Sequence, residues 1–147
     1  MKVKILPSKT SGEVSAPPSK SFAHRYLIGS VLSRGKCVIK NIADSDDISA
    51  TLSCIEQLGG SVTKDGNTVT VIPTNEKQIE NAVFDCKESG STLRFFIPVV
   101  LATGAKNCTF LGSERLLARG IKEYEKLFEN SDVTIKSDEK SIEISGT

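Results

Sequence analysis

Residues 36–39 read Lys-Cys-Val-Ile, and residues 107–110 read Asn-Cys-Thr-Phe, so one short strand-like stretch occurs twice, 71 positions apart. The same offset relates two later pairs of residues, Val62 with Val133 and Val71 with Ile142. A constant offset over three separated segments indicates an internal repeat, and a repeat decides the fold more strongly than any single element does. The sequence therefore predicts one structural unit that is present twice.

The predicted unit has the order β-α-β-α-β-β, and its first copy covers residues 13–75. Its elements are expected, in order, at residues 12–16, 20–33, 36–40, 46–58, 62–64 and 68–72. The second copy covers residues 81–147, with elements at residues 81–86, 91–103, 107–111, 121–129, 133–136 and 141–144. A further strand is expected at residues 3–6, in a segment, residues 1–12, that we assign to another domain. Alternating strands and helices predict an α/β (α+β) fold with helices packed on sheets.

Local signals mark where several of these elements begin and end. Ser45 is a suitable N-cap, because its hydroxyl can accept a hydrogen bond from a free N–H of the helix that follows. The Gly-Gly pair at residues 59–60 is a typical helix stop, and Asp-Gly-Asn at residues 65–67 is a strong hairpin turn. Pro98 lies inside the most apolar helix and predicts a kink or a break there.

Composition and charge exclude several classes of function. The chain has 147 residues, 38% of them hydrophobic and 25% charged, as in an ordinary globular protein. Its net charge of +1 gives no field that favours nucleic acid or an anionic membrane, and no apolar run is long enough for a membrane span. The four cysteines form no C-x-x-C pair, so we expect free thiols and a cytoplasmic protein. With a single histidine, a His-rich metal site is excluded, and we expect no metal.

The opening of the first helix has the features of an anion site. Two prolines hold the preceding chain extended, and the helix then opens with Ser19, Lys20 and Ser21, where free N–H groups and the helix dipole favour an anion. Arg25 lies one turn after Ser21 on the same face, and its guanidinium suits a phosphate or a carboxylate. An ordinary cap with two solvated cations is the alternative. His24 has no visible partner, and a surface or hydrogen-bonded histidine is its simplest interpretation.

Residues 88–94, Glu-Ser-Gly-Ser-Thr-Leu-Arg, occupy the equivalent place in the second copy. Gly90 allows the backbone to approach a ligand closely, the residues after it offer N–H and hydroxyl donors, and Arg94 lies in the first turn. A turn glycine with an ordinary N-cap is the alternative. A third basic segment carries Arg115 and Arg119, four residues apart, and a solvated charged loop is the alternative there.

These motifs, in this order, resemble the EPSP synthase (3-phosphoshikimate 1-carboxyvinyltransferase) family. They are Pro-Ser-Lys-Ser with His-Arg at residues 18–25, Ser-Asp-Asp at residues 45–47 with Ala-Thr-Leu at residues 50–52, and the segment at residues 88–94. The resemblance runs along essentially the whole chain. It implies an enolpyruvate-transferase-like fold, in which each of two domains contains three β-α-β-α-β-β units. The chain would then hold the initial strand and two of the six units.

The resemblance also implies a reaction. The family transfers the enolpyruvyl group of phosphoenolpyruvate to the 5-hydroxyl of shikimate 3-phosphate and releases phosphate, on the shikimate pathway to chorismate and the aromatic amino acids. It uses no metal or organic cofactor, it is the target of glyphosate, and we expect the full enzyme to be a monomer. The implied ligands are Lys20, Gly90 and Arg119 for phosphoenolpyruvate, and Ser21 and Arg25 for shikimate 3-phosphate. Arg94 aligns with a family arginine to which we assign no firm role.

The chain would be an N-terminal part of such an enzyme, and the family's acid–base residues lie in the remainder. Because catalysis also needs the second domain to close and exclude water, we expect the isolated chain to be inactive. Glu88 stands where many members have Asn, and Gly120 where many have Pro. The sister transferase that acts on UDP-N-acetylglucosamine is one alternative, although its opening motif resembles Ser-Gly-Ala-Lys-Asn. A non-catalytic anion-binding module is another.

Overall fold

The computed structural model describes residues 2–74 and 79–146. Their helices are α1 (Lys20–Val31), α2 (Asp46–Gln57), α3 (Gly90–Ala102), α4 (Glu114–Leu117) and α5 (Lys122–Phe128). Their strands are β1 (Cys37–Ile39), β2 (Ser61–Asp65), β3 (Thr68–Ile72), β4 (Val83–Asp85), β5 (Cys108–Leu111), β6 (Thr134–Ser137) and β7 (Ser141–Ser145). All of these elements except the short helix α4 correspond to predicted ones.

The strands form two sheets, one for each repeat. The first has the order β1-β3-β2 and is antiparallel, with Val71 of β3 opposite both Cys37 and Val62. The second has the order β4-β5-β7-β6, in which β4 is parallel to β5 and the other pairs are antiparallel. Within the described ranges, no strand pair joins one sheet to the other.

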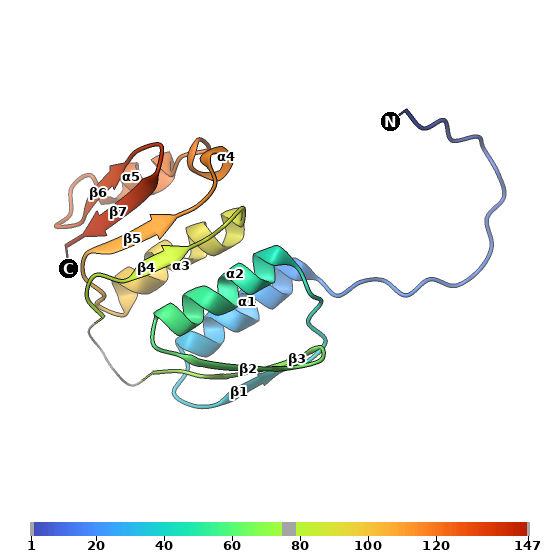
Figure 1. Ribbon diagram of the computed structural model, residues 1–147, viewed down its shortest axis with the longest axis horizontal. Helices are drawn as coiled ribbons and strands as arrows, with labels where there is room; N and C mark the ends of the chain where they lie inside the picture. Colours follow the sequence, from blue (N-terminus) through green and yellow to red (C-terminus); the bar gives the residue numbers. More distant parts are fainter. Residues whose placement is uncertain (1, 75–78, 147) are drawn as a thin grey trace.

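The three longest helices lie between the two sheets, as Figure 1 shows. Helices α1, α2 and α3 contact one another, and their apolar faces form one core with the inner faces of the sheets. Phe84 on β4 anchors the second half of this core, with its ring centroid 5.9 Å from that of Phe96 and 5.1 Å from that of Phe110. The two repeats are therefore joined by packing of helices and side chains rather than by a shared sheet.

The first repeat lacks the edge strand that was expected at residues 12–16, and that prediction was wrong. These residues are exposed and form no strand. The repeat supplies the reason, because Glu13 stands 71 positions before Phe84. A carboxylate cannot take the place of a buried aromatic ring, so this segment lacks the anchor that Phe84 provides in the second repeat. The outer edge of β1 is left without a strand partner in the described part of the chain.

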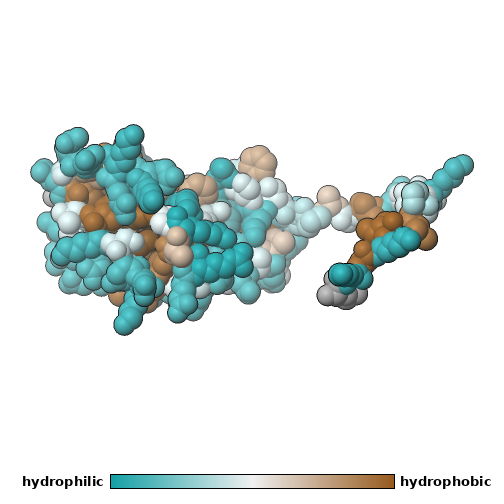
Figure 2. Space-filling view, turned by 90° about the horizontal axis from the view of Figure 1, so that it is seen from above, coloured by the Kyte–Doolittle hydropathy of each residue, from teal (hydrophilic) through white to brown (hydrophobic). Residues whose placement is uncertain are grey.

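Residues 2–17 extend away from the folded body as a tail (Figures 1 and 2). The strand expected at residues 3–6 does not form, because a strand needs a neighbour to pair with and the described residues place none beside it. Ile5 is 88% exposed and Leu6 66%, and Figure 2 shows apolar side chains of the tail in the open. The assignment of residues 1–12 to another domain stays a prediction.

Helix α3 runs through Pro98 without the break that the sequence allowed. Proline has no N–H to donate to the carbonyl of Arg94, four residues earlier. The hydroxyl of Tyr124, on α5, donates to that carbonyl at 2.8 Å. A side chain from a later helix thus replaces the missing bond of α3.

Several predicted boundaries are confirmed. The Ser45 hydroxyl accepts from the backbone N–H of Ile48 at 3.2 Å and caps α2. Gly59 follows the end of α2 with φ +83°, and Gly66 takes φ +52° in the hairpin between β2 and β3. All four cysteines are free thiols. None of the described helices has the length and apolarity to cross a bilayer.

Candidate anion-binding site

Helix α1 begins at Lys20, as predicted, and Ser19 is its N-cap. The Ser19 hydroxyl accepts from the backbone N–H of Phe22 at 3.4 Å. The side chain of Lys20 is already paired, since its Nζ lies 2.5 Å from a carboxylate oxygen of Asp47 in the first turn of α2. An anion that approaches this helix opening therefore competes with Asp47 for Lys20.

Ser21 and Arg25 lie on one face of α1, as their four-residue spacing predicts. Nη1 of Arg25 donates to the carbonyl oxygen of Ser21 at 2.9 Å and also to its hydroxyl. The guanidinium carbon lies 5.2 Å from the centroid of the Phe95 ring on α3. Through this cation–π contact, Arg25 of the first repeat packs against a helix of the second repeat.

At the opening of α3, two arginine side chains converge on Gly90. A Cβ added to Gly90 would lie 3.1 Å from Nη1 of Arg94 and 3.4 Å from Nη1 of Arg119. The absence of a side chain therefore leaves room for both guanidinium groups at the helix N-terminus. Ser89 caps this helix, and its hydroxyl accepts from the N–H of Thr92 at 3.2 Å.

Arg94 is held by the segment that follows α4. Its Nη2 donates to the carbonyl of Gly120 at 3.3 Å. Gly120 has φ +63°, and its N–H donates to the carbonyl of Leu117 at 2.8 Å. Proline can neither adopt this φ nor make this bond, so glycine suits the turn at the position where the resemblance leads one to expect proline.

One open cavity of about 570 Å³ brings these parts together. Four predicted residues line it: Lys20, Gly90, Arg94 and Arg119. The other described residues of the lining are Asp47, Glu88, Ser91, Phe95 and Arg115. Four lining side chains are cations and two are carboxylates, so the described wall carries excess positive charge. Ser21 and Arg25 are not among these residues, and Arg25 adjoins the cavity through its contact with Phe95.

Glu88 faces the same cavity, and its neighbour Lys87 does not neutralise it. Nζ of Lys87 lies 2.6 Å from a carboxylate oxygen of Asp85, and this bond holds the pKa of the Asp85 carboxyl below its usual value. Among the residues that the structure describes, Glu88 has no ion-pair partner. The cavity thus retains one unpaired carboxylate.

Two residues of the site were not identified from the sequence. Phe95 lies in a run of apolar residues that is typical of a core helix, so nothing in the pattern marked it as a wall of the cavity. Asp47 was named only as part of the Ser-Asp-Asp motif at residues 45–47, and its pairing with Lys20 depends on a distance between two helices that the sequence does not give.

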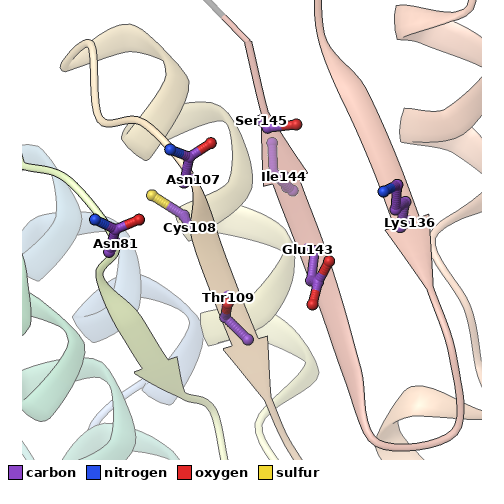
Figure 3. Close-up of a pocket in the computed structure, with 8 residues that line it drawn as sticks. All are labelled: Asn81, Asn107, Cys108, Thr109, Lys136, Glu143, Ile144 and Ser145. Atoms are coloured by element: carbon purple, nitrogen blue, oxygen red, sulfur yellow. The ribbon is translucent and has the colours of Figure 1, made fainter.

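A second cavity, of about 380 Å³, is separate from these residues. Figure 3 shows its lining spread along β5, β7 and β6, with Asn81 and Asn107 near one end. One cation, Lys136, and one carboxylate, Glu143, line it, so the described wall has no excess charge. None of the predicted site residues belongs to it.

Comparisons with known proteins agree with the resemblance. Residues 6–146 match the model of the family EPSP synthase (3-phosphoshikimate 1-carboxyvinyltransferase). The chain is 38% identical over 149 residues to the 3-phosphoshikimate 1-carboxyvinyltransferase of Clostridium novyi (strain NT), covering 95% of the chain and 34% of the relative. It is 39% identical over 153 residues to that of Clostridioides difficile (strain 630), covering 97% of the chain and 35% of the relative.

Among solved structures, an EPSP synthase from Acinetobacter baumannii matches with a TM-score of 0.72 and 18% sequence identity, covering 92% of this chain and 32% of that one. This likeness confirms the predicted fold class. The chain spans about a third of the length of the relatives that it matches. From the family match and these identities, the chain belongs to the EPSP synthase family.

Proposed function

We propose that the chain supplies part of the substrate site for enolpyruvyl transfer from phosphoenolpyruvate to the 5-hydroxyl of shikimate 3-phosphate. Lys20, Gly90 and Arg119 would bind phosphoenolpyruvate, and Ser21 and Arg25 would bind the shikimate ester. The family membership of the chain supports this reaction, and its four free thiols fit a cytoplasmic setting.

The observation that carries the proposal is the cavity between the openings of α1 and α3. Both substrates are anionic, and the cavity combines helix N-termini with cations from separate elements: Lys20 from α1, Arg94 from α3 and Arg119 after α4. Backbone N–H groups and arginines aimed at one point are a suitable environment for phosphate and carboxylate groups. Gly90 gives a ligand access to the backbone at the same point.

The isolated chain would bind without turning over. The cavity is open, and the described residues around it include no second wall that would exclude water from a reacting centre. An assay that mixes the chain with both substrates and follows phosphate release should therefore give no rate above that of buffer. Enolpyruvyl transfer by the chain alone would contradict this part of the proposal.

Calorimetric titration with shikimate 3-phosphate, and then with inorganic phosphate, tests the binding proposal. We expect the shikimate ester to bind more tightly than phosphate, and Arg25→Ala to remove that preference. Lys136→Ala, which removes a cation from the second cavity, is the matched control and should bind as the parent does. Equal weak binding of both ligands would instead support a non-catalytic anion-binding module. Titration with UDP-N-acetylglucosamine tests the sister transferase, which tighter binding of that ligand would support.

A further inference from the structure

A chain of buried polar side chains joins three helices next to the openings of α1 and α3. Nδ1 of His24 on α1 lies 2.8 Å from Oγ1 of Thr51 on α2, which lies 2.7 Å from Oγ1 of Thr92 on α3. Oγ1 of Thr92 lies 2.6 Å from Oγ of Ser89, the N-cap of α3. All four residues are at most 1% exposed. A buried polar side chain is costly unless it is hydrogen-bonded, so these hydrogen bonds tightly constrain the relative positions of the four residues.

Each hydroxyl has a single proton to donate, and this gives the row of hydrogen bonds a direction. Oγ of Ser89 accepts from the Thr92 N–H and from the Thr92 hydroxyl. Thr92 then accepts from Thr51, and Thr51 accepts from His24, which requires the tautomer that carries its proton on Nδ1. The carbonyl of Asp47 lies 3.2 Å from the Thr51 hydroxyl and 3.4 Å from the Thr92 hydroxyl, which makes it a longer and weaker alternative acceptor.

The remaining nitrogen of His24 agrees with this direction. Nε2 is buried and has no hydrogen-bond partner among the described residues. If the chain ran the other way, Nε2 would carry a buried N–H without an acceptor, and orphaned buried N–H groups are rarer than unsatisfied acceptors. The Nδ1–H tautomer leaves only a lone pair there.

We propose that His24 is a positioning residue of the candidate site, which fixes the opening of α1 against the opening of α3 through Thr51 and Thr92. The two repeats share no strand pairing in the described part of the chain, so the placement of Lys20 relative to Gly90 depends on how the helices are held. Apolar packing alone allows helices to shift slightly along one another, whereas a row of short hydrogen bonds fixes the position of α1 relative to α3. The consequence for ligand binding rests on the proposed function, but the register itself does not.

The surroundings of His24 favour its neutral ring. Burial lowers the pKa of His24, Asp47 on α2 opposes this effect, and Lys20 and Arg25 on its own helix add to it. Protonation would place a charge in the core and a second N–H on Nε2, for which the described residues offer no acceptor. Protonation would keep the Nδ1–H donor to Thr51 but would add a buried charge and an unpaired N–H, so the buried ring is neutral.

Nuclear magnetic resonance tests the proposal without any ligand, because His24 is the single histidine and its ring signals need no assignment. We expect the ring nitrogens of the ¹⁵N-labelled chain to show a neutral Nδ1–H tautomer at pH 7. The contact between Arg25 and the Phe95 ring reports the register of α1 and α3, and its nuclear Overhauser effect should weaken in Thr51→Val and in His24→Leu. An Nε2–H tautomer, or an unchanged effect in both variants, would overturn the proposal.

Two further variants separate positioning from general stability. Ser30→Ala removes a buried hydroxyl whose hydrogen bond, among the described residues, goes to the Leu27 carbonyl within α1. It should lower stability and leave the Arg25–Phe95 contact intact. His24→Asn keeps a donor near the position of Nδ1 and should restore the contact that His24→Leu loses. Failure of this rescue, or the same loss of contact in Ser30→Ala, would show that the role is only structural.

Binding of inorganic phosphate supplies the second measurement. We expect Thr51→Val to weaken phosphate affinity about fivefold, a size typical of coupling between neighbouring groups, while Ser30→Ala does not change it. If Thr51→Val binds phosphate as tightly as the parent does, His24 does not position the site. If the chain binds shikimate 3-phosphate no more tightly than phosphate, the proposed function fails. The proposal about helix register is then still tested independently by the resonance data.

Discussion

At the scale of single residues, Glu88 sets a carboxylate among the cations of the cavity. A negative charge at close range opposes an anionic ligand by about 1 kcal/mol in a solvated site. We therefore expect Glu88→Gln to tighten the binding of inorganic phosphate about fivefold at low salt, and less at high salt, where the charge is screened. Calorimetric titration at two salt concentrations measures both effects.

Glu143→Gln is the control for this change, because it removes a carboxylate from the second cavity. Its phosphate affinity should equal that of the parent. If Glu88→Gln also binds as the parent does, the Glu88 carboxylate does not act on the ligand.

Gly90 gives a second test, because the position of a methyl group there is defined. A Cβ would come within 3.1 Å of Arg94 and 3.4 Å of Arg119, at the flexible ends of both side chains. Gly90→Ala should displace the guanidinium groups and weaken phosphate binding several-fold, with little change in the unfolding temperature. Gly29→Ala is the matched control, because its Cβ would meet no described atom within 4 Å and alanine favours a helix. It should raise stability by about 0.5–1 kcal/mol without changing affinity. Parallel losses of affinity in both variants would contradict this account.

The sequence predicts the site residues that depend on local rules and misses those that depend on distance. Lys20 and Gly90 follow from helix openings, which can be recognised from proline, serine and glycine alone. Phe95 and the partner of Lys20 belong to contacts between elements far apart in the chain, so no local pattern marks them. Glu88 lies in the cavity wall, two residues before Gly90, and the pairing of Lys87 with Asp85 instead of Glu88 depends on geometry that the sequence does not give.

At the scale of elements, α3 depends on a bond that it does not make itself. Tyr124→Phe should leave the Arg94 carbonyl without its donor and lower the free energy of unfolding by about 1–3 kcal/mol. In a Pro98→Ala background the same change should cost less, because the alanine N–H can bond to that carbonyl. Chemical denaturation of the two single variants, the double variant and the parent measures the coupling. Equal costs in the two backgrounds would show that Tyr124 does not compensate for Pro98.

The repeat shows which elements could be predicted and which could not. The second copy matches its predicted order, and its first strand, β4, has both the strand pattern and a buried anchoring side chain, Phe84. In the first copy the pattern at residues 12–16 is strand-like, but Glu13 stands at the position that corresponds to Phe84. The 71-residue offset aligns the two positions without showing that their side chains differ in kind. Helix α4 is one turn long, which is too short to leave a periodic signal.

At the scale of the whole molecule, His24 makes the stability of the chain depend on pH. Because its pKa is lower in the folded chain than the ordinary 6.5, the unfolded chain binds a proton more readily. The contribution of His24 is present above pH 6.5 and is lost as the pH falls below it, by at most about 1.4 kcal/mol per pH unit. The lowered pKa of Asp85 also stabilises the folded chain, but this contribution changes with pH only below the ordinary pKa of 3.8, where it is lost.

Urea denaturation between pH 8 and pH 5 measures this dependence, and His24→Asn is the control that should flatten it, since asparagine does not titrate. A parent curve without a slope in this range would show that His24 is not protonated on unfolding.

The contact surface between the helices of the two repeats, here called the seam, has a consequence for any molecule that occupies the cavity. Lys20 lies on one side of the seam, and Gly90 and Arg119 lie on the other, so a bound anion would act as a non-covalent staple across it. Hydrogen–deuterium exchange should then slow at the facing amides of α1 and α3 together when phosphate is added, while the hairpin of β2 and β3 keeps its rate. A ligand that slowed only one of the two helices would be held by half of the seam.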